Sequence, residues 1–124
     1  MSKNEDDFHE FVGKEVSADL YGINSKKLSD IAFLKKICEE AAKESNMTVI
    51  NTFVQKYDPQ GYDIFVALAE SNITIHTYEE HFACFVNVFT CGRKSNALKG
   101  MMYIIEKLEP REVKNMQIIP RGMF

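Results

Sequence analysis

The sequence predicts an α+β fold, a two-layer sandwich in which an antiparallel sheet carries two helices on one face. Six segments have the apolar alternation or β-branched content of strands, and four of these follow one another with only short turns between them. Two further segments have the three-to-four-residue apolar spacing of amphipathic helices. Runs of consecutive strands favour antiparallel pairing, so the expected order of elements is β-α-β-β-β-β-α-β.

The N-terminal part is predicted to contain one strand and one long helix. The strand is expected over residues 15–20, just before Tyr21-Gly22. A single helix is then expected over residues 26–44, because apolar residues recur there every three or four positions and charged residues occupy the other positions. The apolar stripe of this helix consists of Leu28, Ile31, Leu34, Cys38 and Ala41.

The centre of the chain is predicted to contain four strands. Residues 47–57 and 62–69 should form a hairpin, because Asp58-Pro59-Gln60-Gly61 between them has the residues of a turn. Residues 73–78 and 81–90 follow as two further strands, and the second of these is apolar and aromatic along most of its length.

The C-terminal part is predicted to contain a helix and a last strand. Ser95 is a suitable N-cap for a helix over residues 96–108, and Pro110 lies just beyond the end of that helix. The last strand is expected over residues 113–119.

Composition limits the class of protein and its partners. The 124 residues suffice for one domain with a substantial core, and we expect a flexible tail over residues 1–12 and a single domain over residues 13–124. The formal net charge of −3 argues against a nucleic-acid partner, and no apolar stretch approaches the ~20 residues of a membrane span. The acidic N-terminal residues do not resemble a signal peptide, so we expect a cytoplasmic protein.

The cysteines and histidines form no metal-binding pattern. The three cysteines contain no C-x-x-C pair, and the three histidines are not at ligand spacing from them. We therefore expect reduced thiols and no metal ion.

The central strands are apolar on both faces. Phenylalanines occupy one parity of these strands and valines the other, at Phe65, Phe85 and Phe89 and at Val66, Val86 and Val88. A sheet that is apolar on both faces must cover the face that the helices leave open. A second copy of the chain is the simplest cover, so we expect a homodimer.

Three residues with reactive side chains, Ser71, His76 and Cys91, lie in or directly beside two neighbouring predicted strands. Each taken alone is more often a turn, half-buried or packing residue than a catalytic one. If the two strands pair antiparallel, Cys91 returns to the region of Ser71, and a hydroxyl, an imidazole and a thiol could converge at one end of the sheet. Such a set suits acid–base chemistry, and by itself it does not distinguish a hydrolase from a transferase or a decarboxylase.

Several segments resemble one enzyme family. Residues 67–80, Ala-Leu-Ala-Glu-Ser-Asn-Ile-Thr-Ile-His-Thr-Tyr-Glu-Glu, are similar to the signature of the prokaryotic S-adenosylmethionine decarboxylases. Val88-Phe89-Thr90-Cys91-Gly92 resembles a second motif of that family at the same distance from the serine. Gly13, residues 19–22 and Pro59-x-Gly61 match its opening strand and hairpin, so the resemblance covers residues 13 to 119.

The resemblance implies a proenzyme of polyamine biosynthesis that makes its own cofactor. In the family the serine, here Ser71, attacks the preceding carbonyl, here that of Glu70, and the chain breaks between residues 70 and 71, leaving a pyruvoyl group in place of Ser71. That ketone condenses with the amine of the substrate and supplies the electron sink that decarboxylation needs and ordinary side chains lack. The match assigns His76 to processing and Cys91 to protonation of the carbanion.

The resemblance also identifies substrate-binding candidates. Tyr57 falls at the family's adenine-stacking aromatic residue, Tyr78 keeps an aromatic ring beside the site, and Glu80 falls at the carboxylate associated with the ribose hydroxyls. Asp63 replaces a serine that assists processing in the family, and Asn72 replaces a histidine.

The substitution at Asp63 leaves the substrate open. Asp63 is either a solvated strand residue or a partner for a cationic substrate side chain, because a buried cation requires one. We therefore expect decarboxylation of S-adenosylmethionine to the aminopropyl donor, with arginine or ornithine, giving agmatine or putrescine, as the alternative. A remoter alternative is a regulatory subunit that has lost processing.

Overall fold

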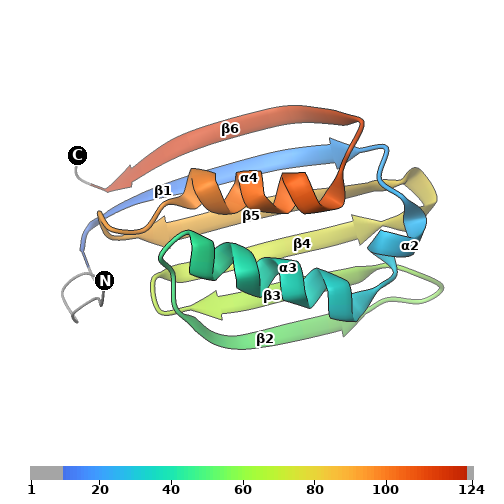
Figure 1. The fold of residues 1–124 in the computed structure, drawn as a ribbon, viewed down its shortest axis with the longest axis horizontal. Coiled ribbons are helices and arrows are strands. Elements are labelled where there is room, and N and C mark those ends of the chain that lie inside the picture. Colours follow the sequence, from blue (N-terminus) through green and yellow to red (C-terminus); the bar gives the residue numbers. More distant parts are fainter. Residues whose placement is uncertain (1–9, 123–124) are drawn as a thin grey trace.

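The computed structural model describes residues 10–122, and Figure 1 shows their arrangement. The elements in chain order are β1 (Val12–Tyr21), α2 (Ser25–Leu28), α3 (Ile31–Glu44), β2 (Val49–Lys56), β3 (Tyr62–Leu68), β4 (Ser71–Tyr78), the 3₁₀ turn η1 (Glu79–His81), β5 (Ala83–Cys91), α4 (Ala97–Leu108) and β6 (Glu112–Gly122).

The strands form one antiparallel sheet in the order β2-β3-β4-β5-β1-β6. The helices α3 and α4 lie beside each other across one face of it, as Figure 1 shows. The core is the layer between them, where side chains of one strand parity meet the apolar sides of both helices. The predicted α+β sandwich and its order of elements are therefore confirmed.

The first predicted helix is divided in two. Residues 26–44 were expected to be one helix, but α2 ends at Leu28 and α3 begins at Ile31. Asp30 is the N-cap of α3, and its carboxylate accepts a hydrogen bond from the backbone N–H of Phe33 at 3.0 Å. Such a cap is more favourable at a helix start than within a helix, so it explains the break.

Several further boundaries also differ from the prediction, and two of them have a clear local cause. The N-cap of α4 is Asn96 rather than Ser95, because the Asn96 side chain accepts a hydrogen bond from the backbone N–H of Lys99 at 3.1 Å. The fifth strand begins at Ala83 rather than at residue 81, because η1 and Phe82, which has a φ of 52°, form a turn before it.

The ends of the chain are described only in part. Val12 already belongs to β1, so the sheet includes the last residue of the expected tail. The rest of that prediction falls mainly on residues 1–9, which lie outside the described residues. None of the helices in residues 10–122 has the length and apolar composition of a membrane span.

The sheet face opposite the helices is rich in exposed aromatic rings. Val66, Val86 and Val88 are buried under the helices, as their parity predicts. On the other face Phe65 and Phe85 are each 40% exposed. The prediction of two apolar faces is confirmed, and in the single chain the second face, which we call the open face, is uncovered.

Candidate active site

The bond between Glu70 and Ser71 lies at one end of the sheet, where β4 begins. The register pairs Ser71 with Thr90, so Cys91 is beside this bond on the neighbouring strand. The backbone N–H of Cys91 donates a hydrogen bond to the carbonyl oxygen of Glu70 at 3.0 Å. A donor aimed at a carbonyl oxygen stabilises negative charge that develops there when a nucleophile attacks the carbon.

The side chain of Glu70 also helps to fix the position of the Glu70–Ser71 peptide bond. It is only 2% exposed, and its carboxylate accepts hydrogen bonds from the backbone N–H of Thr48 at 2.8 Å and from the Thr48 hydroxyl at 3.3 Å. The N–H of Ala69 donates to the Thr48 carbonyl at 2.9 Å. The residue before Ser71 is therefore fixed by β5 through its backbone and by the segment before β2 through its side chain. Sequence analysis missed this role, because Thr48 is far from Glu70 in the chain.

Cys91 has the properties of a proton donor. Burial raises the pKa of its thiol above the ordinary value, and the nearby Arg121 guanidinium lowers it in part. Gly13 of β1 pairs with Cys91 on one side and with Arg121 on the other. Because its pKa is raised, the thiol keeps its proton at neutral pH.

The other two cysteines are core residues. Cys38 and Cys84 are fully buried. Burial raises the pKa of both thiols, that of Cys84 to about 12. They stabilise packing and have no access to a substrate.

A surface pocket of about 400 Å³ lies at the opposite end of β3 and β4. It contains His76 and all four residues expected to bind substrate. The lining residues are Tyr57, Gln60, Gly61, Asp63, His76, Thr77, Tyr78 and Glu80. The structure therefore brings these predicted residues together, although they come from the turn after β2, from β3, from β4 and from η1.

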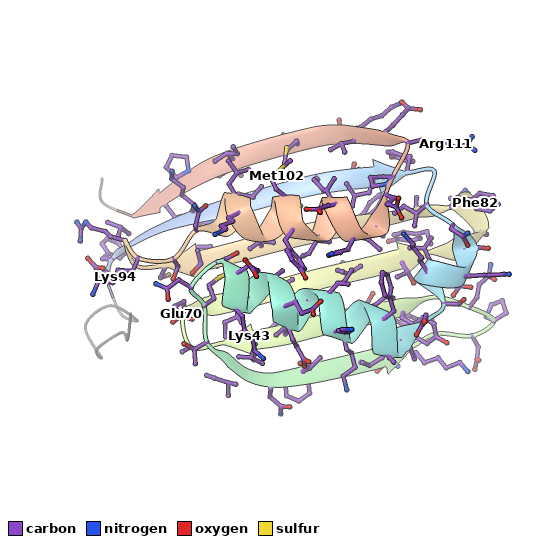
Figure 2. All side chains as sticks on the ribbon, viewed as in Figure 1. Lys43, Glu70, Phe82, Lys94, Met102 and Arg111 are labelled. Atoms are coloured by element: carbon purple, nitrogen blue, oxygen red, sulfur yellow. The ribbon has the colours of Figure 1, made fainter. Side chains whose placement is uncertain are left out.

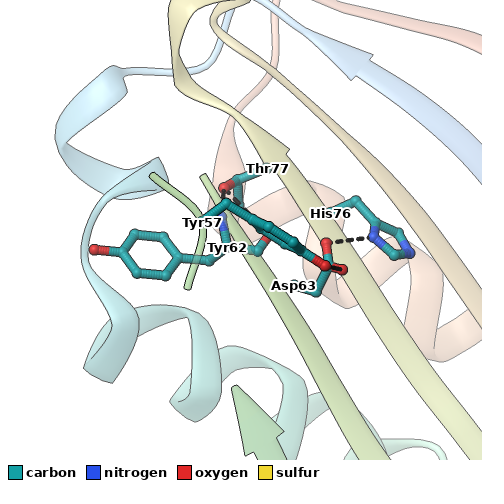
Figure 3. A network of polar contacts seen from close by, with 5 residues as sticks. All are labelled: Tyr57, Tyr62, Asp63, His76 and Thr77. Carbon is teal, nitrogen blue, oxygen red and sulfur yellow. Dashed lines mark hydrogen bonds and ion pairs between the residues drawn. The ribbon is translucent and has the colours of Figure 1, made fainter. Parts of the chain in front are cut away.

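Asp63 is the centre of the polar network in this pocket, shown in Figure 3. One oxygen of its carboxylate is 2.5 Å from Nδ1 of His76, and the other accepts a hydrogen bond from the Tyr57 hydroxyl at 2.5 Å. This bond and the adjacent negative charge raise the pKa of Tyr57, so its hydroxyl stays protonated. The Asp63 side chain, which is 30% exposed, is thus in contact with two other side chains, and its pairing with a cationic substrate stays a prediction.

Strand register explains why these side chains meet. Asp63 and His76 are directly paired across β3 and β4. The hydroxyl of the buried Thr77 accepts a hydrogen bond from the backbone N–H of Tyr62 at 2.8 Å, which fixes the pairing beside Asp63. The turn before β3 closes through a bond from the N–H of Tyr57 to the carbonyl of Gly61 at 2.9 Å, and this returns Tyr57 to the pocket.

The remaining pocket residues add aromatic surface and charge. The Tyr78 ring lies 4.8 Å from that of Phe85, between centroids, on the open face. The Glu80 carboxylate accepts a hydrogen bond from the Gln60 amide at 2.8 Å. The pocket thus offers two aromatic rings and two carboxylates to a ligand.

The expected convergence of Ser71, His76 and Cys91 at one end of the sheet is wrong for His76. It is five residues along β4 from Ser71 and pairs with Phe85 rather than with Thr90. At the rise of an extended strand this separates them by about 16 Å. Figure 2 shows these two ends of the sheet, with Glu70 at one end and Phe82, just after η1, at the other. The Ser71–Cys91 end and the His76 pocket, called the two half-sites below, are therefore separate within one chain.

Comparisons with known proteins agree on one family. The family model described as S-adenosylmethionine decarboxylase matches residues 14–122. The S-adenosylmethionine decarboxylase proenzyme of Aquifex aeolicus (strain VF5) is 38% identical over 112 residues, 90% of this chain and 82% of the relative. The arginine decarboxylase proenzyme of Hyperthermus butylicus is 38% identical over 102 residues, 81% of this chain and 72% of the relative.

A solved structure agrees as well. The crystal structure of the adenosylmethionine decarboxylase from Aquifex aeolicus VF5 matches with a TM-score of 0.83 and 35% identity, and the match covers 94% of this chain and 95% of that one. Sequence and fold thus lead to the same conclusion: this chain belongs to the S-adenosylmethionine decarboxylase family of enzymes.

Proposed function

We propose that the chain cleaves itself between Glu70 and Ser71 and then decarboxylates S-adenosylmethionine with the pyruvoyl group that this cleavage creates. The observation that carries the proposal is the Glu70 carbonyl, held between the Cys91 N–H and the anchored Glu70 side chain. The Ser71 hydroxyl attacks this carbonyl carbon, and the peptide bond becomes an ester. Loss of the Ser71 α-proton then breaks the ester and releases the main chain of Glu70 as a new C-terminal carboxylate. Water finally replaces the nitrogen of residue 71, which leaves as ammonia, and a ketone remains.

The second step uses the same end of the sheet. The pyruvoyl ketone supplies the electron sink for loss of carbon dioxide. Cys91 lies beside residue 71 and, with its raised pKa, supplies the proton that replaces the carboxyl group. The pocket around Tyr57 and Tyr78 has the aromatic surface that an adenine ring requires, and Glu80 can accept hydrogen bonds from ribose hydroxyls.

We also propose that the working enzyme is a homodimer with the two open faces in contact. The exposed rings of the open face need a cover. A two-fold axis running across the strands would place the His76 pocket of one copy over the Ser71 end of the other. The separation of about 16 Å between Ser71 and His76 in one chain supports this proposal, because the dimer would bring the two half-sites together. The cytoplasmic location stays a prediction from sequence.

Arginine is the second candidate substrate. The pocket contains two carboxylates, Asp63 and Glu80, and a guanidinium binds well to such groups. The arginine decarboxylase proenzyme of Hyperthermus butylicus is as similar in identity as the first relative. S-adenosylmethionine remains the first candidate because both oxygens of Asp63 already accept hydrogen bonds from the protein itself.

The test combines mass spectrometry with a substrate panel. Purified wild type should contain two chains, residues 1–70 and 71–124, with a ketone at the start of the second, and Ser71→Ala should contain one. Release of carbon dioxide should be fastest with S-adenosylmethionine among S-adenosylmethionine, arginine, ornithine and lysine. An intact wild-type chain that still decarboxylates would refute the pyruvoyl mechanism, and an intact inactive chain would favour the regulatory subunit.

A further inference from the structure

We propose that Asp63 is a positioning residue for self-cleavage: its carboxylate fixes the His76 imidazole in the tautomer that carries its proton on Nδ1, which leaves Nε2 to move protons. This inference rests on the proposed function and deepens it, because it assigns a task to the residue that departs from the family pattern.

The geometry of the carboxylate determines the tautomer. An ionised carboxylate has only acceptors, and Nδ1 of His76 lies 2.5 Å from one of its oxygens, so Nδ1 must carry a hydrogen. The neutral imidazole then has its lone pair on Nε2. The Tyr57 hydroxyl donates to the other oxygen, so two donors from different segments keep the carboxylate in place.

The surrounding structure also holds Asp63 against His76 before any ligand arrives. The two residues are paired across β3 and β4, and the Thr77 hydroxyl bonds both backbone groups of Tyr62, the residue before Asp63. Asp63 is the less exposed partner, with 30% of its side chain accessible against 46% for His76. Asp63 therefore holds the imidazole through Nδ1, while the rest of the His76 ring is accessible to solvent or to a second chain.

A fixed tautomer matters for the chemistry of cleavage. The proton on Ser71 and the α-proton of the same residue must both leave during the conversion, and an imidazole with a free Nε2 can accept a proton. An imidazole with its hydrogen on Nε2 cannot do so from that side. A carboxylate that only orients the ring thus changes the rate of cleavage without touching the reacting atoms, as in the carboxylate–histidine pairs of other enzymes.

The test uses the full-length chain and two readouts. The variant Asp63→Asn keeps the shape of the side chain, but its amide group can donate to Nδ1 and favours the other tautomer. We expect self-cleavage to slow by roughly 100-fold. Nitrogen-15 NMR of the Ser71→Ala chain, which stays intact, should show hydrogen on Nδ1 of His76, and hydrogen on Nε2 when Asp63→Asn is added. Asp63→Glu should restore part of the rate.

The matched control is Gln55→Ala. Gln55 pairs with Asp63 from the other side, on the edge strand β2, and its amide bonds the carbonyl of Lys56. Its truncation should leave the tautomer and the cleavage rate as in wild type.

Two results would overturn the inference. One is hydrogen on Nε2 of His76 with Asp63 intact, and the other is folded Asp63→Asn that cleaves within about twofold of wild type. If wild type itself does not cleave, the proposed function fails, while the NMR comparison still decides whether Asp63 sets the tautomer.

Discussion

The separation between the half-sites makes a quantitative prediction about two inactive variants. His76→Ala removes the imidazole and Ser71→Ala removes the nucleophile, so neither chain should cleave efficiently alone. Five residues of extended strand span about 16 Å, whereas a hydrogen bond reaches only about 3 Å. His76 therefore cannot serve the Ser71 of its own chain, and it should serve that of a partner.

Co-expression of the two variants with different tags measures this directly. Random pairing of equal amounts puts roughly half of the His76→Ala chains in mixed dimers, where the partner supplies the missing imidazole. Intact mass spectrometry should therefore find roughly half of these chains cut, with light scattering giving twice the chain mass. Mixed dimers in which every His76→Ala chain stays intact would refute the shared site, and so would full cleavage of His76→Ala by itself.

Three further predictions concern single side chains. Arg121→Gln should raise the pKa of Cys91 further, because it removes the cation that favours the thiolate, so the pH dependence of Cys91 alkylation should move to higher pH. Cys91→Ala should still cleave itself but should lose most turnover, whereas Cys84→Ala should only lower the free energy of unfolding, by about 1 kcal/mol or more. Tyr57→Ala should lower kcat/KM for S-adenosylmethionine, measured per cleaved chain because the Tyr57 hydroxyl also holds Asp63, by the loss of one stacking contact, about 1–3 kcal/mol, and should lower arginine turnover less.

Periodicity predicted the sheet well because the signal is spread over many residues. The alternation of Val86 and Val88 with Phe85 identified both the buried face and the open face, and the structure agrees. Periodicity failed where a single residue determines the end of a helix. The apolar stripe continues from α2 to α3, but Asp30 between them is the N-cap of α3, which only its bond to the N–H of Phe33 shows.

The candidate site could be predicted only as far as local spacing allows. The backbones of Ser71 and Cys91 lie on neighbouring strands at the same end of the sheet, as antiparallel pairing of consecutive strands predicts. Ser71 and His76 lie five residues apart on one strand, so their spacing in the sequence already indicates that their side chains are far apart. The prediction of convergence failed because the family resemblance assigns both residues to one reaction. The bond between Asp63 and His76 depends on the exact register of β3 and β4, which no pattern in the sequence determines.

The sheet order has a consequence for the enzyme after cleavage. A cut between residues 70 and 71 leaves β1, β2, β3 and α3 on one chain and β4, β5, α4 and β6 on the other. The pairings β3 with β4, β5 with β1 and β1 with β6 then all join the two products, as does the contact between α3 and α4. Because β1 is enclosed by two strands of the other product, the cut removes one covalent bond and leaves the shared core and its hydrogen bonds in place. The two chains should therefore stay together without a covalent link, and the new N-terminus at residue 71 should remain beside Cys91, where the decarboxylation needs it.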